Sequence, residues 1–310
     1  MSDAQTTAES ATFEKDQFEK GQFEKGQFEK GKGGHPGGPA AITPRNVHFD
    51  AVKDVDMRDW HSGNTVLSAF FNGLSLSFPD GEAFFVNAVR AHAKDVSDPE
   101  LRKHVKGFMT QESIHSREHD VYNDQLLDQG FGRARGILAM NKRWLDFVEQ
   151  KLGRTSALAD TCAAEHFTAI LADMLLSDER FMGDANPDMA KLWRWHAIEE
   201  TEHKAVAFDV FKTAYPGARG YFIRCSAMAL TAFFFPLGMV LGTITMLRDK
   251  GDLYNWKDWG KALKWFWARP AFFPRMMLRV LPYFKPSFHP WDEQNYHYVE
   301  DYNKAATDAA

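Results

Sequence analysis

The chain has 310 residues, a net charge of −5 and a calculated isoelectric point near 6.2. Without a basic excess, nucleic acid is not an expected partner, and two cysteines are too few for a disulfide framework. Residues 1–45 contain no apolar core of a secretion signal, so we expect the protein in the cytoplasm.

The amino-terminal segment has a low-complexity composition. Residues 13–32 repeat a five-residue unit, FEKDQ, FEKGQ, FEKGQ and FEKGK, and a glycine-rich run follows at residues 31–38. A period of five places successive phenylalanines on different sides of a helix, and glycine lowers helix stability further. The sequence therefore predicts a disordered tail over residues 1–45.

From about residue 64 the spacing of apolar residues is helical, and no long stretch alternates with a period of two. Helix-start residues indicate where several helices begin. The expected helices are 65–78; one starting at Asp80; one starting at Pro99 after Asp98; 134–152; one capped by Thr155 or Ser156; and one from Pro187, after Asn186, to near Tyr215. The predicted fold class is all-α.

Four of these helices carry a repeated pattern of Glu and His. In chain order the pattern is a lone Glu, a Glu-x-x-His pair, a second lone Glu and a second Glu-x-x-His pair. Residues three apart on a helix share a face, so each pair can reach one metal ion. This is the ligand set of a di-iron or di-manganese carboxylate site. The residues are Glu82, Glu112, His115, Glu165, Glu200 and His203.

The spacing of the four units predicts their connections. Successive leading glutamates are 30, 53 and 35 residues apart. The two shorter gaps suit antiparallel helix hairpins, and the longer gap suits a crossover between them, as in ferritin-like bundles. We expect a ferritin-like four-helix bundle with a dimetal core over residues 46–218.

Three further residues extend the predicted centre. His196 lies four residues before Glu200 on the same helix face, which makes it a seventh candidate ligand. His119 and Glu199 lie beside the ligand positions, and we expect them to orient ligand imidazoles. The chain-order assignment places Glu82, Glu112 and His115 on one ion, and Glu165, His196, Glu200 and His203 on the other.

Carboxylate and imidazole donors together favour iron, with manganese and zinc as alternatives.

The last third of the chain is predicted to be a hydrophobic and basic-aromatic helical extension, residues 219–310. Residues 225–247 carry no charge over a length that suits a membrane span. Residues 248–290 combine nine Lys and Arg with four Trp, a composition that suits a membrane interface. Peripheral attachment at the inner face of the membrane is the favoured interpretation. An integral span and a soluble buried helix pair broken at Pro236 are the alternatives.

The ligand order, the apolar segment and the Phe288-His289-Pro290-Trp291 turn together resemble a bacterial family labelled predicted metal-dependent hydrolases, over about residues 45–300. This resemblance implies a ferritin-like fold with ligands at the seven positions named above. The set of three His and four Glu is also similar to that of the di-iron N-oxygenases that oxidise aryl amines.

Three functions follow as hypotheses. The first is an oxygen-activating di-iron oxidoreductase, of hydroxylase, N-oxygenase or desaturase type, which would act on an apolar small molecule or lipid and need an electron donor. The alternative is a metal-dependent hydrolase that uses water bound by two metal ions. The third is metal storage in the manner of ferritin, against which the large hydrophobic extension argues.

Overall fold

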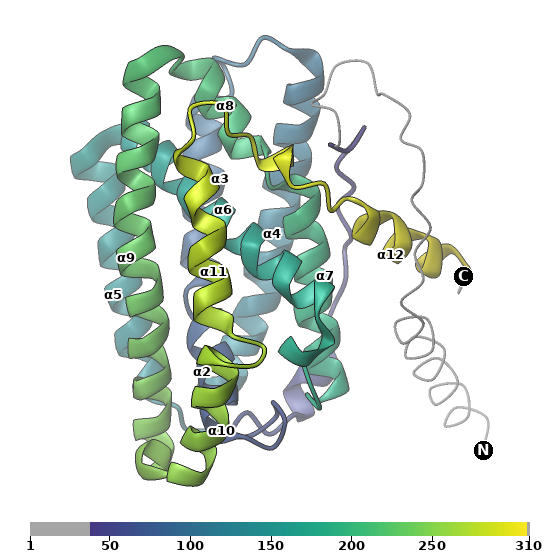
Figure 1. Ribbon diagram of the computed structural model, residues 1–310, viewed down its shortest axis with the longest axis vertical. Coiled ribbons are helices and arrows are strands. Elements are labelled where there is room, and N and C mark those ends of the chain that lie inside the picture. The colour runs from purple at the N-terminus through teal and green to yellow at the C-terminus, as the bar shows by residue number, and fades with distance from the viewer. Residues whose placement is uncertain (1–37, 309–310) are drawn as a thin grey trace. The chain divides into compact units, whose positions relative to one another are not determined.

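Residues 38–308 are described by the structure, a computed structural model, and they contain no β-strand (Figure 1). The all-α prediction is confirmed. The helices are α2 (Thr65–Ser75), α3 (Phe78–His92), α4 (Pro99–Asp128), α5 (Ala134–Phe147), α6 (Gly153–Ser177), α7 (Pro187–His203), α8 (Val206–Ala214), α9 (Gly217–Lys250), α10 (Trp256–Trp267), α11 (Phe272–Val280) and α12 (His297–Asp308). Short 3₁₀ turns occur at Asp50–Asp54, Glu179–Phe181, Asp252–Tyr254, Leu281–Phe284 and Pro290–Asp292.

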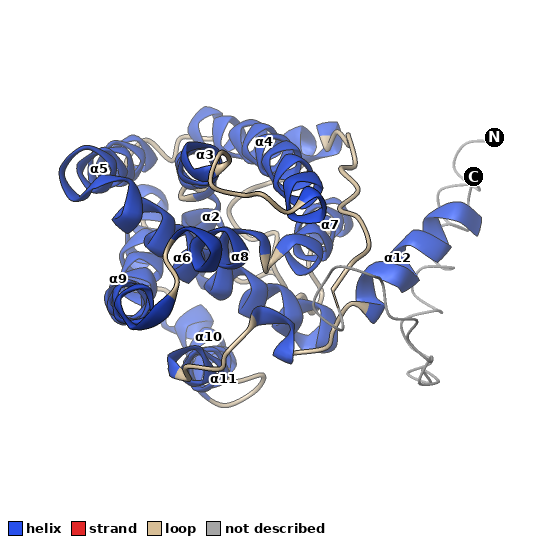
Figure 2. Ribbon diagram, turned by 90° about the horizontal axis from the view of Figure 1, so that it is seen from above, coloured by secondary structure: helices blue, strands red, loops and turns tan. Residues whose placement is uncertain are grey.

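Four helices form the bundle that carries the predicted ligands. Helix α3 packs against α4 and α6, and α6 packs against α7. Short connections join α3 to α4 and α6 to α7, whereas α5 and the π-helical turn Val148–Leu152 link the two pairs. These are the two hairpins and the longer crossover that the spacing of the glutamates predicted. Figure 2 shows the four helices around a common centre, with α5 and α9 together at one side.

Two of the predicted helix starts are confirmed. The Asp98 side chain accepts a hydrogen bond from the Glu100 amide, and the Asn186 side chain accepts hydrogen bonds from the amides of Asp188 and Met189. In both cases proline occupies the first helical position, where its missing N–H costs nothing. Each cap therefore sets where a ligand-bearing helix begins.

Two other predicted starts are wrong. Asp80 lies in the first turn of α3, because the helix already begins at Phe78. Helix α6 begins at Gly153, before Thr155 and Ser156, because the π-helical turn that follows α5 leads directly into it. Polar residues near a helix start suit either the cap or the first turn, so sequence alone misplaced both boundaries.

The helix expected from Pro187 to near Tyr215 is two helices in the structure. Helix α7 ends at His203, and Lys204 and Ala205 separate it from α8. The buried Lys204 ammonium donates hydrogen bonds to the Glu293 carbonyl and the Asn295 side chain. These partners come from the distant carboxyl-terminal segment, so the local sequence pattern did not reveal the break.

Helix α9 runs without interruption through Pro236, so the alternative of a helix pair broken at that residue is wrong. The helix packs along α2 and α6, and Gly73 of α2 meets Gly242 of α9 so closely that a Cβ on Gly73 would lie 2.9 Å from the Gly242 carbonyl carbon. The predicted extension therefore begins along the flank of the bundle. The division of the chain into domains near residues 45 and 218 stays a prediction.

Part of the predicted tail packs against the bundle. Ile42 is buried against Gly107 of α4, and Arg45 binds the carboxylate of Glu199 on α7. The remainder of the predicted tail, residues 1–37, lies outside the described residues.

Candidate metal centre

The structure brings all seven predicted ligand side chains together in the core of the bundle. Helix α3 supplies one of them, α4 two, α6 one and α7 three, and every one is buried. Groups of their donor atoms lie within 4.8 Å of one another, as a bound metal ion requires. They are Glu82, Glu112, His115, Glu165, His196, Glu200 and His203.

Glu200 lies at the middle of this centre. Its Oε1 atom is 3.0 Å from His196 Nε2 and 3.6 Å from His115 Nδ1, whereas its Oε2 atom is 3.5 Å from His203 Nε2. The two oxygens of one carboxylate thus face different imidazoles. A carboxylate in this position could contact a cation on either side of it.

The remaining carboxylates divide between the two sides. Glu82 Oε1 lies 3.9 Å from His196 Nε2, and Glu165 Oε2 lies 3.6 Å from His203 Nε2. Glu112 Oε1 lies between His203 Nε2, at 2.9 Å, and His115 Nδ1, at 3.9 Å. We call Glu82, His115 and His196 the α3 side, and Glu165 with His203 the α6 side; Glu112 and Glu200 lie between them.

The position of His196 differs from the chain-order assignment, which grouped it with His203. Its ring stacks on that of His115, with centroids 4.2 Å apart. His196 and His203 are seven residues apart on α7, which is about 10 Å along the helix axis. At that separation they face opposite sides of the centre, with Glu200 between them.

Hydrogen bonds outside the centre fix the protons of two imidazoles. His115 Nε2 donates to Glu199, 3.1 Å away, which leaves its Nδ1 atom to face the carboxylates and a bound cation. His203 Nδ1 donates to the Gln111 side-chain oxygen at 2.9 Å, which leaves its Nε2 atom in the same role. Such partners are common for metal-binding histidines because they orient the ring and raise its basicity.

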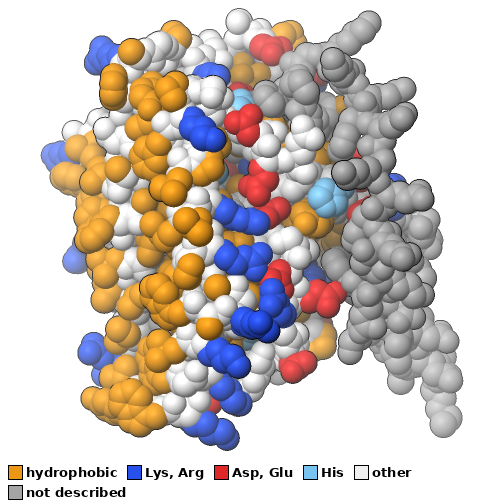
Figure 3. Space-filling view, in the orientation of Figure 1, with side chains coloured by type: hydrophobic (Ala, Val, Ile, Leu, Met, Phe, Trp, Pro, Cys, Tyr) orange, Lys and Arg blue, Asp and Glu red, His pale blue; other side chains and the backbone are white. Residues whose placement is uncertain are grey.

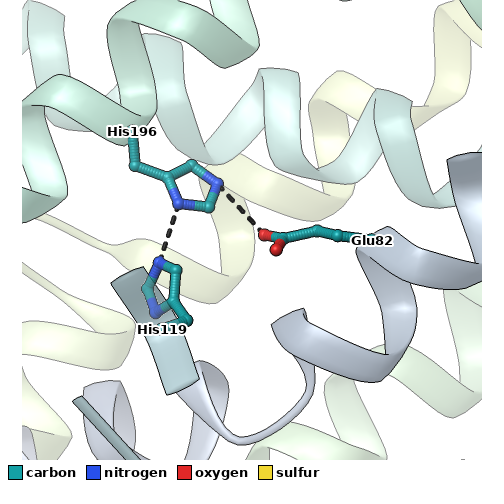
Figure 4. Close-up of side chains that lie close together, drawn as sticks. All are labelled: Glu82, His119 and His196. Carbon is teal, nitrogen blue, oxygen red and sulfur yellow. Dashed lines mark hydrogen bonds and ion pairs between the residues drawn. The ribbon is translucent and has the colours of Figure 1, made fainter. Parts of the chain in front are cut away.

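His196 is held through a longer chain of hydrogen bonds, of which Figure 4 shows the bond between His196 and His119. Ser75 donates its only hydroxyl proton to Asn123, so it accepts a hydrogen bond from His119 Nδ1. His119 Nε2 is then an acceptor, and it receives the Nδ1 proton of His196 over 2.8 Å. The Nε2 atom of His196 faces Glu82 and Glu200, and in this tautomer it would be free to bind a cation there.

His119 and Glu199 lie within hydrogen-bond distance of His196 and His115, and their orienting role stays a prediction, because His119 also belongs to a group that could hold a metal ion. Sequence reasoning missed Gln111, although it adjoins Glu112, because nothing in the local pattern distinguishes it. Arg45, which donates to both Glu199 and Glu202, was also missed, since it comes from the predicted tail.

Seven donor atoms of this centre are buried without a hydrogen-bond partner. They include both carboxylate oxygens of Glu82 and of Glu165, together with one atom each of Glu112, His115 and His203. His203 Nε2 and Glu112 Oε1 approach to 2.9 Å, but without the geometry of a hydrogen bond. Unpaired polar groups are costly to bury, and native proteins rarely leave them unsatisfied. The donor set therefore fits bound cations, and two divalent ions would balance four ionised carboxylates.

The protonation of the side chains supports the same conclusion. Burial, with the neighbouring Glu112 carboxylate, raises the pKa of Glu82 and of Glu165 well above the ordinary value. Burial alone would lower the pKa of His115, but its bonds to Glu199 and Glu200 raise it to about 10. Protons thus occupy the centre when no cation does, and metal binding must displace them.

A large apolar cavity of about 980 Å³ reaches the centre from one side. Glu82 and Thr168 line it, and Thr168 donates a hydrogen bond to Glu200. The rest of the lining comes mainly from apolar residues of α5 and α9. The cavity therefore connects the α3 side of the centre with the flank of the bundle.

Together, the bundle and the buried cluster define a helical protein with a site able to hold metal ions. The chain belongs to the family described as predicted metal-dependent hydrolase, which matches residues 43–294. The resemblance seen in the sequence is thereby confirmed. No curated protein and no solved structure matches the chain.

Proposed function

We propose that the protein is a dimetal enzyme that acts on a substrate with a long apolar portion, which it binds in the cavity between α5 and α9. The observation that carries this proposal is the continuity of the cavity with the centre. Glu82, whose two carboxylate oxygens have no partner, lines the same cavity as the exposed side chains Trp144 and Phe222. A substrate lying there would place one end beside the metal ligands.

Hydrolysis is the first candidate reaction, because the family is described as metal-dependent hydrolases. Two bound metal ions lower the pKa of water and polarise a carbonyl or phosphoryl group. The protein itself would hold the ions through the seven donor side chains and exclude bulk water by burial. Glu199, Gln111 and His119 would orient the imidazoles by accepting their N–H protons. The apolar cavity wall would orient the substrate.

Oxygen-dependent oxidation of the same kind of substrate is the second candidate. The donor set favours it, because four carboxylates and three imidazoles on bundle helices suit a di-iron site. In that case an electron donor is a further partner. The sequence pattern placed this reaction first, whereas the family description favours hydrolysis.

The two reactions are separated by measuring product and oxygen together. The purified protein, loaded with iron, manganese or zinc in turn, is given acyl esters of increasing chain length in a sealed oxygen electrode. Hydrolysis predicts acid release without oxygen uptake and faster turnover of long chains than of short ones. Oxidation predicts oxygen uptake only with iron and a reductant. No turnover with any metal, or equal turnover of short and long chains, would contradict the proposal.

A further inference from the structure

Among the residues that the structure describes, the large exposed apolar side chains lie mostly on the flank that α5, α9 and α10 form. In the part of the chain that the structure describes, eighteen large hydrophobic residues are exposed, and all fall between residues 140 and 281. They belong to α5, α9, α10, α11 and the adjoining turns, and none belongs to α3, α4, α6 or α7. Figure 3 shows hydrophobic side chains gathered along the edge of the molecule on which α9 lies. Apolar patches of this extent on soluble proteins mark interaction sites.

The same flank carries a strong positive charge. Residues 219–290 contain eleven Lys and Arg and only three acidic residues, a net charge of +8, while the other residues together carry −13. The three acids are engaged within the protein. Asp249 pairs with Arg133, Asp252 pairs with Arg58, and Asp258 accepts hydrogen bonds from Thr65. Among the lysines and arginines, Arg224 is buried, Lys250 binds a backbone carbonyl, and Arg275 and Arg279 pair with aspartates of the bundle. The other seven are exposed and can face an anionic surface: Arg219, Arg248, Lys257, Lys261, Lys264, Arg269 and Lys285.

The mouth of the large cavity lies within this flank. Seven of the eighteen exposed hydrophobic residues also line the cavity, so its opening is surrounded by apolar side chains. Six of them are Met140, Trp144, Phe222, Leu230, Phe234 and Leu241. An apolar substrate would have to cross this exposed apolar rim to reach Glu82.

We propose that the flank formed by α5, α9 and α10 binds an anionic lipid bilayer, and that the cavity takes a single-chain amphiphile directly from the membrane to the metal centre. Delivery of a substrate to the metal centre rests on the proposed function, whereas binding of the flank to a bilayer does not depend on it. Lys and Arg beside an apolar helix face are the combination by which proteins attach to anionic membrane surfaces.

Attachment along the surface fits the structure better than a membrane-spanning α9. Helix α9 has the length and composition of a span, and because only 22% of its most apolar window is buried within the protein, it is not a covered core helix. Helix α5 lies beside α9 at the cavity and exposes Arg135, Lys142 and Arg143. If α9 crossed the bilayer, these charges would enter its hydrocarbon core, which is costly. At the surface, their side chains reach the lipid headgroups.

The docking is tested with the metal-loaded full chain in a vesicle flotation assay. The variant Phe233→Glu, Leu237→Glu changes two exposed residues of α9 that do not line the cavity. Its matched control, Asn87→Glu, Thr110→Glu, adds the same charge to exposed positions on α3 and α4.

We expect the wild type and the control to float with phosphatidylglycerol-containing vesicles, less so with phosphatidylcholine alone or in high salt. The α9 variant should bind the vesicles at least about tenfold more weakly, because two apolar side chains can no longer be buried in the bilayer. Several outcomes would overturn the proposal: no flotation of the wild type, no loss in the α9 variant, or retention in the membrane after alkaline carbonate extraction. A dimer that the α9 variant dissociates, without vesicle binding, would assign the flank to a second copy of the chain.

Entry into the cavity is tested with vesicles that contain a photoactivatable fatty acid. A Cβ on Gly238, which lines the cavity, would have no atom within 4 Å, so Gly238→Trp obstructs the cavity without a backbone clash. Gly260→Trp is the control, because Gly260 lies on α10 in equally open space outside the cavity.

We expect labelling of α5 and α9 in the wild type and in Gly260→Trp, and its loss in Gly238→Trp at unchanged metal content and flotation. Equal labelling of both variants would contradict entry through the cavity. Labelling needs no turnover, so a labelled protein without activity contradicts the proposed function alone. Activity on soluble esters without any labelling contradicts this inference alone.

Discussion

The interior of the bundle and the α5–α9 flank depart from the usual distribution of side chains in opposite ways: the interior holds polar groups, and the flank exposes apolar ones. The interior buries four carboxylates and three imidazoles, of which several atoms have no hydrogen-bond partner, whereas the flank exposes large apolar residues such as Phe222 and Phe233. Buried unpaired charge and exposed apolar surface are both unfavourable unless something binds there. The comparison supports the two proposals above, in which cations complete the interior and a lipid surface covers the flank, and the cavity contacts both regions.

The largest expected effect comes from removing the carboxylate shared by the two sides. Glu200→Ala takes away oxygens that face His196 and His203, so we expect the loss of both metal ions and of activity. Metal analysis and circular dichroism measure this. Glu149→Ala, at an exposed position on the turn after α5, is the control and should keep its metal. Full metal content in Glu200→Ala would contradict the central position of this residue.

Removal of the metal should destabilise the interior without affecting the flank. Chelation leaves the seven donor atoms unpaired, at a cost of several kcal/mol, and we expect the melting temperature to fall by about 10 °C. Vesicle flotation should persist after chelation as long as the protein stays folded. An unchanged melting temperature, measured by calorimetry, would show that no cation stabilises the folded state.

The two sides of the centre should respond separately to their orienting residues. His119→Phe removes the acceptor of the His196 proton, and Gln111→Leu removes that of the His203 proton. We expect each variant to weaken one of two metal-binding steps by about 10–100-fold. Titration calorimetry with manganese resolves the steps. Weakening of the same step by both variants would refute the assignment of His196 and His203 to opposite sides.

The smallest expected effect concerns Asp160, which lines the cavity and accepts a hydrogen bond from Thr231. Burial raises its pKa from 3.8 to about 6, so the folded protein binds the extra proton and loses stability as the pH rises through this range. We expect Asp160→Asn to stabilise the protein by about 1–2 kcal/mol near neutral pH and by much less at low pH. Asp146→Asn, a control on α5 whose side chain is 45% exposed, should show neither effect in urea titrations at the two pH values.

Much of the bundle was predictable because its information is local. The spacing of Glu82, Glu112, Glu165 and Glu200 predicted the four helices and their connections, and helical periodicity placed His196 beside Glu200. The break after His203 was not predictable, since Lys204 is bound by residues near the carboxyl terminus. The same holds for Gln111 and Ser75, whose roles arise only from contacts between helices.

The flank illustrates the same limit. The uncharged stretch of residues 225–247 predicted an apolar helix, but composition did not reveal whether its surface is buried. Packing against α2 and α6 covers one side of α9, and the other side remains exposed beside the cavity.

The dimetal centre is tested most directly by the metal content of the protein, purified without chelators and under exclusion of oxygen. Mass spectrometry of the metals should find about two ions per chain, bound tightly enough to survive gel filtration. The reason is that the charge of four carboxylates balances that of two divalent cations. A chain that carries no metal, and takes up none when iron, manganese or zinc is offered, would contradict the dimetal centre.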